Sequence, residues 1–110
     1  MTLNADLLRG YTEAIILCRL SGGDSYGYLI NREISDQTGG RCELKEATLY
    51  TAFRRLEQGG FIASYWGDEQ SGARRRYYTL TAGGRERILR EQAQWEETKK
   101  LIDQLLEAVP

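Results

Sequence analysis

The stretch EATLYTAFRRLEQGGFIASYWGDEQSGARRRYYTL, residues 46–80, decides the fold. Its first part, 46–58, predicts a helix, because apolar residues recur there at the spacing of one helical face. These residues are Leu49, Ala52, Phe53 and Leu56. Gly59 and Gly60 follow directly and are expected to end the helix.

The second part of this stretch predicts a β-hairpin. Segments 61–67 and 74–80 are rich in aromatic and β-branched residues, which is typical of strands. DEQSGA at 68–73 would form the turn between them. Alternation along the second strand places Tyr78 and Leu80 on one face, where we expect them to join the core.

Two more helices are expected before this stretch. The first covers about 5–20 and is apolar on two sides, so it needs two burying surfaces, of which one can be a second subunit. Its two stripes are Leu7, Gly10, Ala14 and Leu17, and Leu8, Tyr11, Ile15 and Cys18. The second helix covers about 25–37, with Asp24 or Ser25 as N-cap, and a short strand is expected at 41–44.

The chain ends in a long helix, expected at about 82–108 behind a Thr81 cap. Apolar residues repeat in it every seven positions, a pattern typical of coiled coils. They are Ile88, Trp95, Ile102 and Val109. The predicted fold class is therefore α+β, mainly α with a small β-hairpin. Residues 1–80 would form a winged helix-turn-helix domain and residues 81–110 a C-terminal dimerisation helix.

Composition argues against an enzyme. The 110 residues include no histidine, which removes the commonest general base and metal ligand, and no catalytic motif is recognisable. Cys18 and Cys42 are not spaced like a metal site or a redox pair. We therefore predict no enzymatic activity, no cofactor and no metal. The sequence also lacks an apolar run long enough to span a bilayer and a secretory signal, so we predict a cytoplasmic protein without membrane contact.

Positive charge is concentrated in the middle of a chain whose net charge is −1. Residues 41–80 carry seven basic and five acidic side chains, whereas both flanking parts have an acidic excess. A basic surface on a nearly neutral protein suits a polyanionic partner. Most of this charge comes from Arg54, Arg55, Arg74, Arg75 and Arg76.

In a winged helix-turn-helix the helix at 46–58 enters the major groove of double-stranded DNA, and the hairpin supports it as the wing. Alternation along the strand points Arg74 and Arg76 one way and Arg75 the other, so part of the cluster would face DNA and the rest pair with acids. Lys45 opposes the helix dipole, a cost that a nearby phosphate would offset. The expected DNA-binding residues are Lys45, Thr48, Tyr50, Thr51, Arg54, Arg55, Arg74, Arg75 and Arg76.

Residues 43–84, ELKEATLYTAFRRLEQGGFIASYWGDEQSGARRRYYTLTAGG, resemble the signature half of the PadR family of bacterial transcriptional regulators. LLRGYTEAIILCRL at 7–20 and the YG at 26–27 are similar to that family's opening helices. The single C-terminal helix resembles the compact branch, which includes LmrR-like repressors of multidrug transporters. The resemblance implies a homodimer that binds a palindromic operator and usually represses.

In LmrR-like members, a tryptophan from each C-terminal helix flanks a channel at the dimer interface where flat aromatic compounds stack. The resemblance places Trp95 in that role, with Leu7, Ala14 and Leu17 lining the channel. Gln92 and Lys99 stand where drug-binding members carry an aromatic and an acid, so a lysine here would favour neutral or anionic effectors. Packing of Trp95 in the dimer, without any effector, is the alternative.

Two functions follow from these residues. The first is a dimeric DNA-binding regulator, expected to repress a nearby operon such as a transporter or stress gene. The second is a winged helix that docks on a protein partner and uses its arginines for acidic side chains. Binding to DNA that weakens steeply with added salt would separate the two.

Overall fold

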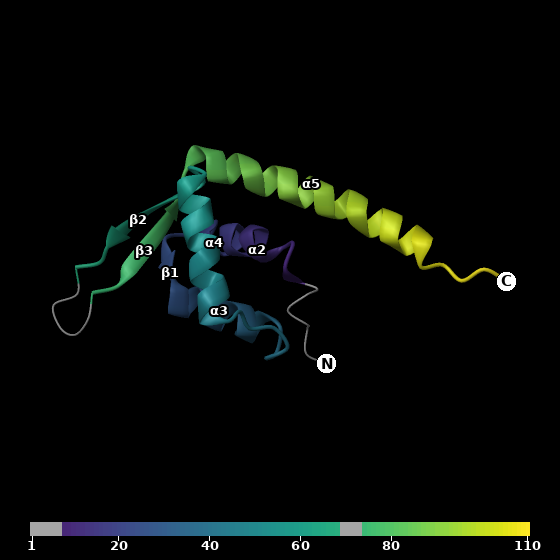
Figure 1. Cartoon of the computed structure of the whole chain (residues 1–110), viewed down its shortest axis with the longest axis horizontal. Helices are drawn as coiled ribbons and strands as arrows, with labels where there is room; N and C mark the ends of the chain where they lie inside the picture. The colour runs from purple at the N-terminus through teal and green to yellow at the C-terminus, as the bar shows by residue number, and fades with distance from the viewer. Residues whose placement is uncertain (1–7, 69–73) are drawn as a thin grey trace.

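A computed structural model describes residues 8–68 and 74–110, so the predicted site residue Leu7 and the tip of the hairpin lie outside it. Helices and a small sheet form one body, from which the last helix extends (Figure 1). The predicted α+β winged-helix fold class is confirmed. In chain order the elements are α2 (Thr12–Leu20), β1 (Ser25–Tyr26), α3 (Gly27–Gln37), α4 (Glu46–Gln58), β2 (Ile62–Trp66), β3 (Arg76–Leu80) and α5 (Ala82–Leu105).

Helix α4 has the predicted bounds and the predicted buried face, since Leu49, Ala52, Phe53 and Leu56 are all buried. The ring of Phe53 stacks on Tyr78 of β3, with centroids 4.0 Å apart and planes 15° apart. This contact joins the helix to the hairpin. Gly60, which follows the helix, has φ +80°, a conformation that glycine adopts without strain.

The sheet has three antiparallel strands in the order β1-β3-β2. Two predictions are wrong here. Ser25 and Tyr26 pair with Tyr78 and Tyr77 in strand β1 instead of starting a helix. Residues 41–44 form a loop and not the predicted strand. Asp24 and Ser25 therefore do not cap α3, whose N-cap is Tyr26. The reason is tertiary: a two-residue strand is specified by its partner strand and not by its own pattern.

The loop before α4 is fixed by Asn31 of α3. The Asn31 side chain donates to the carbonyl oxygen of Leu44 at 2.7 Å and accepts from the Leu44 N–H at 2.9 Å. Leu44 and Cys42 are both buried. Burial of these two side chains and the hydrogen bonds of Asn31 therefore hold the loop in place, without a strand.

Helix α2 is buried along a face that neither predicted stripe describes. Its buried residues are Thr12, Ile16, Leu17 and Leu20. Thr12 is polar, but its hydroxyl donates to the carbonyl oxygen of Leu8 at 3.1 Å, so this buried hydroxyl has a hydrogen-bond partner. Leu8, Ile15 and Cys18 are half-buried against the same core. The described α2 starts at Thr12, later than predicted.

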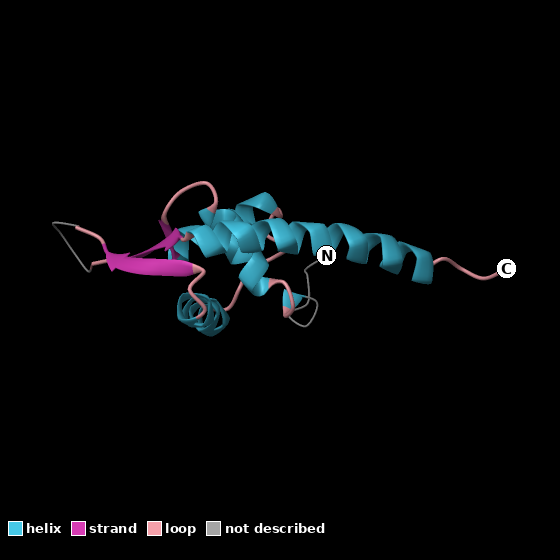
Figure 2. Ribbon diagram, turned by 90° about the horizontal axis from the view of Figure 1, so that it is seen from above, coloured by secondary structure: helices cyan, strands magenta, loops and turns pink. Residues whose placement is uncertain are grey.

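Helix α5 starts in the core and then leaves it. The Thr81 hydroxyl caps it by accepting from the Gly84 N–H at 3.1 Å, as predicted. Gly84 passes so close to Phe61 that a Cβ there would lie 2.2 Å from the Phe61 carbonyl oxygen. Ile88 is buried, but beyond it the helix extends past the body (Figures 1 and 2). The helix ends at Leu105, three residues before the predicted end at 108.

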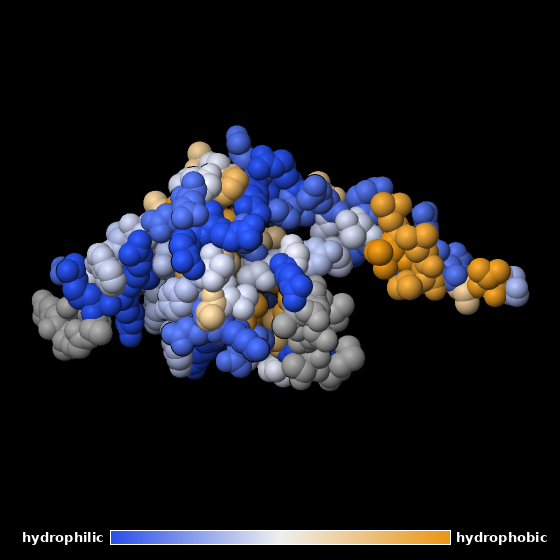
Figure 3. Space-filling view, in the orientation of Figure 1, coloured by the Kyte–Doolittle hydropathy of each residue, from blue (hydrophilic) through white to orange (hydrophobic). Residues whose placement is uncertain are grey.

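The distal part of α5, which we define as residues 92–105, carries large apolar side chains on its surface. Figure 3 shows apolar side chains gathered toward the C-terminal end of this helix. The exposed apolar residues of the distal part are Trp95, Leu101, Ile102 and Leu105, and Leu106 and Val109 follow it. A surface of this kind, on one arm of a molecule 65 Å long, is typical of a binding interface.

Candidate nucleic-acid interface

The face of α4 that points away from the core is polar and exposed. Thr48, Thr51 and Arg54 are all exposed, in agreement with the rotation of 100° per residue that opposes them to the buried face. No ion pair joins Arg54 to another residue in the described ranges. Its guanidinium is therefore available to an external partner.

A groove of about 780 Å³ lies between α4, the start of α3 and the two strands of the wing. Four arginines from two separate parts of the chain meet along it, together with several aromatic side chains. Its lining residues include Arg54, Arg74, Arg75, Arg76, Tyr26, Tyr28, Tyr50 and Trp66. Guanidinium groups and aromatic rings around a groove form a surface that suits phosphates and bases.

Arg76 fastens the wing to α4. Its guanidinium lies 3.4 Å from a Glu57 carboxylate oxygen of α4 and donates to the Ser64 hydroxyl of β2 at 2.8 Å. Ser64 in turn donates to Glu57 at 2.5 Å. The same guanidinium lies 5.6 Å from the ring centroid of Trp66. Arg76 is thus the member of the cluster that pairs with an acid, as alternation along the strand had suggested for some of them.

Arg74 and Arg75 are both exposed and directly precede β3, at the outer end of the described part of the wing. The Arg75 guanidinium stacks over the ring of Tyr26 at 4.7 Å from its centroid, and Arg74 Nε donates to the Gly67 carbonyl oxygen at 3.4 Å. These contacts fix where the two guanidinium groups lie. Both side chains are exposed and line the groove, where a polyanion can reach them.

A row of tyrosines crosses the sheet beneath Arg75. Tyr77 lies between Tyr26 and Tyr65 in the strand register, and the rings of Tyr65 and Tyr77 stack at 5.6 Å. The Tyr65 hydroxyl donates to Asp24 at 2.7 Å. Hydrogen bonds from Thr79 and Tyr65 lower the pKa of Asp24. The bond between Tyr65 and Asp24 also raises the pKa of Tyr65. Asp24 therefore stays ionised and anchors the outer strand of the wing.

Two predicted DNA-binding residues near the start of α4, Lys45 and Tyr50, lie in different surroundings. Tyr50 is partly exposed and packs edge-on against Phe53 at 5.7 Å, so it lines the groove and supports the core. Lys45 is the N-cap of α4, makes no side-chain cap and is exposed. It lines a second groove of about 540 Å³ between α3 and α4, next to Glu43 and Glu46.

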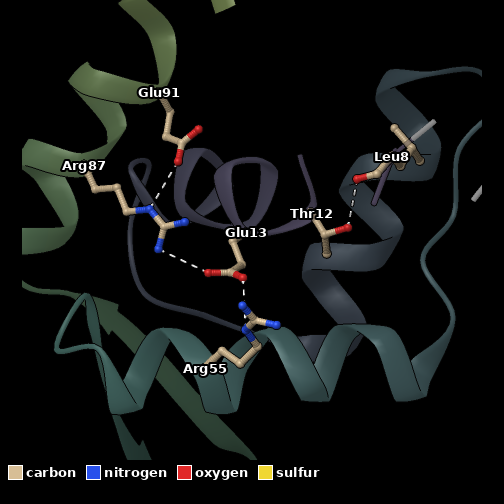
Figure 4. Close-up of polar contacts among 6 residues, drawn as sticks. All are labelled: Leu8, Thr12, Glu13, Arg55, Arg87 and Glu91. Atoms are coloured by element: carbon tan, nitrogen blue, oxygen red, sulfur yellow. Dashed lines mark hydrogen bonds and ion pairs between the residues drawn. The ribbon is translucent and has the colours of Figure 1, made fainter. Parts of the chain in front are cut away.

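Arg55 lies apart from the groove, although it follows Arg54 directly. Its Nε lies 3.4 Å from a Glu13 carboxylate oxygen of α2 (Figure 4). The other oxygen of Glu13 lies 3.1 Å from the guanidinium of Arg87 on α5, which also pairs with Glu91 at 3.2 Å. The sequence placed Arg54 and Arg55 together because both lie on the outer face of the helix. Their separate roles depend on Glu13, which is distant in the chain.

The residues predicted for an effector site are only partly brought together. Trp95 is 45% exposed and packs edge-on against Tyr11, with centroids 5.3 Å apart, while Ala14 is half-buried. Leu17 is completely buried in the core of its own chain. Gln92 is exposed, and Lys99 pairs with Glu96 at 2.9 Å. Tyr11 is the aromatic partner that sequence reasoning did not select.

The chemistry of the described residues offers no metal or redox site. No three His, Cys, Asp or Glu side chains of the described ranges cluster as a metal ion would require. Cys18 and Cys42 are free thiols, and burial raises the pKa of each. Both therefore remain neutral thiols in the folded chain. No helix in the described ranges is long and apolar enough to cross a membrane.

Residues 16–90 match the profile of the transcriptional regulator PadR-like family. The chain belongs to this family. Among solved structures, a transcriptional regulator from Clostridium thermocellum is 42% identical and superposes with a TM-score of 0.88 over 96% of this chain and 100% of that chain. A PadR family transcription regulator from Clostridium difficile is 36% identical, with a TM-score of 0.78 over 89% of this chain and 100% of that one.

A curated relative, an uncharacterised protein X from Lysinibacillus sphaericus, is 38% identical over 97% of this chain and 98% of its own length. Membership of the PadR-like family makes this chain a transcriptional regulator, in a family of regulators and not of enzymes. The family match covers α4 and the wing, the part of the chain where the arginines gather.

Proposed function

We propose that this PadR-like regulator binds operator DNA as a homodimer, with α4 in the major groove and the wing on the adjacent backbone. One observation carries the proposal. Arg54 of α4 and the arginines of the wing lie along one groove, where Arg76 holds the two elements together. Side chains from a helix and a hairpin that share a basic surface can contact bases and phosphates at once.

The distal part of α5 supports the second half of the proposal. A pair of copies would cover the exposed side chains of Ile102 and Leu105, which the chain's own body does not reach. A symmetric pair would then present two α4 helices to a palindromic site, separated by one turn of DNA, about 34 Å, or a multiple of it. Bound across a promoter, such a dimer represses a nearby operon, for example one with a transporter or stress gene.

An aromatic effector would act at the pair formed by Tyr11 and Trp95, which joins α2 to α5. A ligand there shifts the regulator only if it binds one spacing of the two DNA-binding surfaces better than the other. Lys99 is paired with Glu96, so its charge is partly compensated and a neutral aromatic compound is favoured. Quenching of tryptophan fluorescence by neutral, anionic and cationic aromatic compounds tests this part.

The DNA-binding proposal is tested by a gel shift with the DNA upstream of the protein's own gene, at two salt concentrations. The double variant Arg54→Ala with Arg75→Ala should weaken binding by about tenfold or more and flatten its dependence on salt, since lost base and phosphate contacts have these effects. The matched control is Arg85→Ala with Arg90→Ala, which removes two exposed arginines of α5.

The control should bind nearly as tightly as the unchanged protein and should show the same salt dependence. Equal losses in both variants would contradict the assigned surface. If no DNA fragment shifts at low salt, the alternative of a winged helix that docks on an acidic protein surface takes its place.

A further inference from the structure

The side chain of Glu13 lies where three helices meet (Figure 4). Each of its two carboxylate oxygens contacts a different guanidinium: Arg55 of α4 at 3.4 Å and Arg87 of α5 at 3.1 Å. The side chains of Glu13 and Arg87 are only 25% and 20% exposed. The Glu13–Arg87 pair is therefore screened less by solvent than a surface pair is, whereas the Arg55 side chain is 70% exposed.

Arg87 makes two more contacts besides the one with Glu13. It pairs with Glu91 one turn along α5 at 3.2 Å. Its guanidinium also lies 4.7 Å from the ring centroid of Phe61, which follows the two glycines at the end of α4. Glu13 therefore connects Arg55 to an arginine that cannot move independently of α5. In this way the carboxylate couples the orientation of α4 to that of α5.

We propose that Glu13 is a positioning residue that sets which half-site spacing of DNA this regulator accepts. The inference rests on the proposed function, in which two copies pair through α5 and each inserts α4 into DNA. The angle between α4 and α5 within one copy then fixes the distance and twist between the two α4 helices. A stiff connection accepts one spacing, whereas a loose connection tolerates several.

DNA geometry makes this coupling measurable. One extra base pair between two half-sites moves one of them by about 3.4 Å and turns it by about 35°. A dimer whose α4 helices are held rigidly must lose contacts at such a site. Replacing Glu13 with Gln removes the negative charge and turns one of the two oxygens into an NH2 donor, which cannot accept from the guanidinium group that it faces.

The experiment uses the full-length protein and a duplex that carries its preferred site, selected from random DNA. In further duplexes the central spacer is shortened or lengthened by one and by two base pairs. The unchanged protein should bind one spacing best. In Glu13→Gln the ratio of affinities between the best spacing and its neighbours should fall by about threefold or more, which is a typical size for coupling effects.

Two more variants separate positioning from direct contact. Glu86→Gln changes an exposed acid on the same part of α5 by the same charge, and it should keep the spacing profile. Arg55→Gln should broaden the profile as Glu13→Gln does, and its salt dependence should stay that of the unchanged protein. Because the Arg55 side chain is 70% exposed, this variant folds and carries the test if Glu13→Gln does not.

Three results would overturn the inference. In the first, Glu13→Gln and Arg55→Gln both keep the sharp dependence of affinity on spacing that the unchanged protein shows. In the second, Arg55→Gln weakens binding equally at every spacing and lowers the salt slope by about one, which is the sign of a phosphate contact. In the third, the unchanged protein selects no site with two half-sites, and then the proposed function fails together with this inference.

Discussion

The winged body and the distal part of α5 treat their apolar side chains in opposite ways. In the body, Phe53 and Leu56 of α4 are 1% and 0% exposed, and α2 and the sheet pack against this helix. In the distal part, Ile102 and Leu105 are 47% and 79% exposed. Burial of apolar surface is worth about 25 cal/mol per Å². The body buries its apolar side chains within one chain, whereas the distal part can bury them only against a partner.

The difference also separates two kinds of helix. Helix α4 is held by contacts within the chain, with buried side chains from Leu49 to Leu56. The distal part of α5 has few contacts within the described chain, and isolated helices of this length are only marginally stable in water. We infer that the body is an independent fold and that pairing completes the distal part.

The largest expected effect comes from removing a core side chain of the body. Phe53→Ala should lower the free energy of unfolding by about 3–5 kcal/mol, because the cavity cannot be filled by collapse between α4 and β3. Denaturant unfolding followed by circular dichroism measures it. Leu105→Ala, measured at a concentration where the chains are separate, should change stability by less than about 0.5 kcal/mol. Equal losses would erase the comparison.

The reach of sequence reasoning follows the same division. The bounds and buried face of α4 could be predicted because its apolar residues follow one helical period within thirteen positions. Strand β1 could not, because Ser25 and Tyr26 are held by pairing with Tyr78 and Tyr77, which are remote in the chain. The core face of α2 was not predicted because Ala14 to Cys18 form an unbroken apolar run, so several stripes fit equally well.

The candidate site divides in the same manner. The gathering of Arg54 with the wing arginines followed from the helix-then-hairpin order. The separate roles of adjacent Arg54 and Arg55 did not, because they depend on where Glu13 of α2 lies. Likewise, alternation could divide Arg74, Arg75 and Arg76 into two sets but could not say which would meet Glu57.

The next largest effect is expected at the distal part of α5. Ile102→Asp should raise the dissociation constant of the dimer by about 100-fold or more, because a symmetric interface loses the apolar contact twice and each loss is worth about 1.5–3 kcal/mol. Sedimentation over a concentration series measures it. The unfolding of the body in separate chains should not change.

The matched control introduces the same residue on another side of the helix. Gln104→Asp lies about 200° around α5 from Ile102, and it should leave association nearly unchanged. If both variants weaken pairing to the same degree, the apolar stripe is not the interface. If neither does, the distal part of α5 does not pair the chains.

The smallest expected effect concerns pH and belongs to the body alone. Hydrogen bonds from Thr79 and Tyr65 lower the pKa of Asp24 in the folded chain. They therefore stabilise the folded state at pH values above the unfolded pKa of about 4. This stabilisation is lost as the pH falls through the lower pKa of the folded chain. Tyr65→Phe should reduce this acid-dependent loss, which urea unfolding at neutral and acidic pH would show. A variant with an unchanged pH profile would contradict the role of this contact.

The claim that joins both regions is that distal α5 pairs two chains so that two α4–wing surfaces meet one DNA. Native mass spectrometry of the protein with its selected duplex tests it directly. The account predicts that the unchanged protein binds the duplex only as two chains of 12.6 kDa each, whereas Ile102→Asp should show complexes with a single chain per duplex before saturation. Saturation of the full site by one chain of the unchanged protein would contradict it.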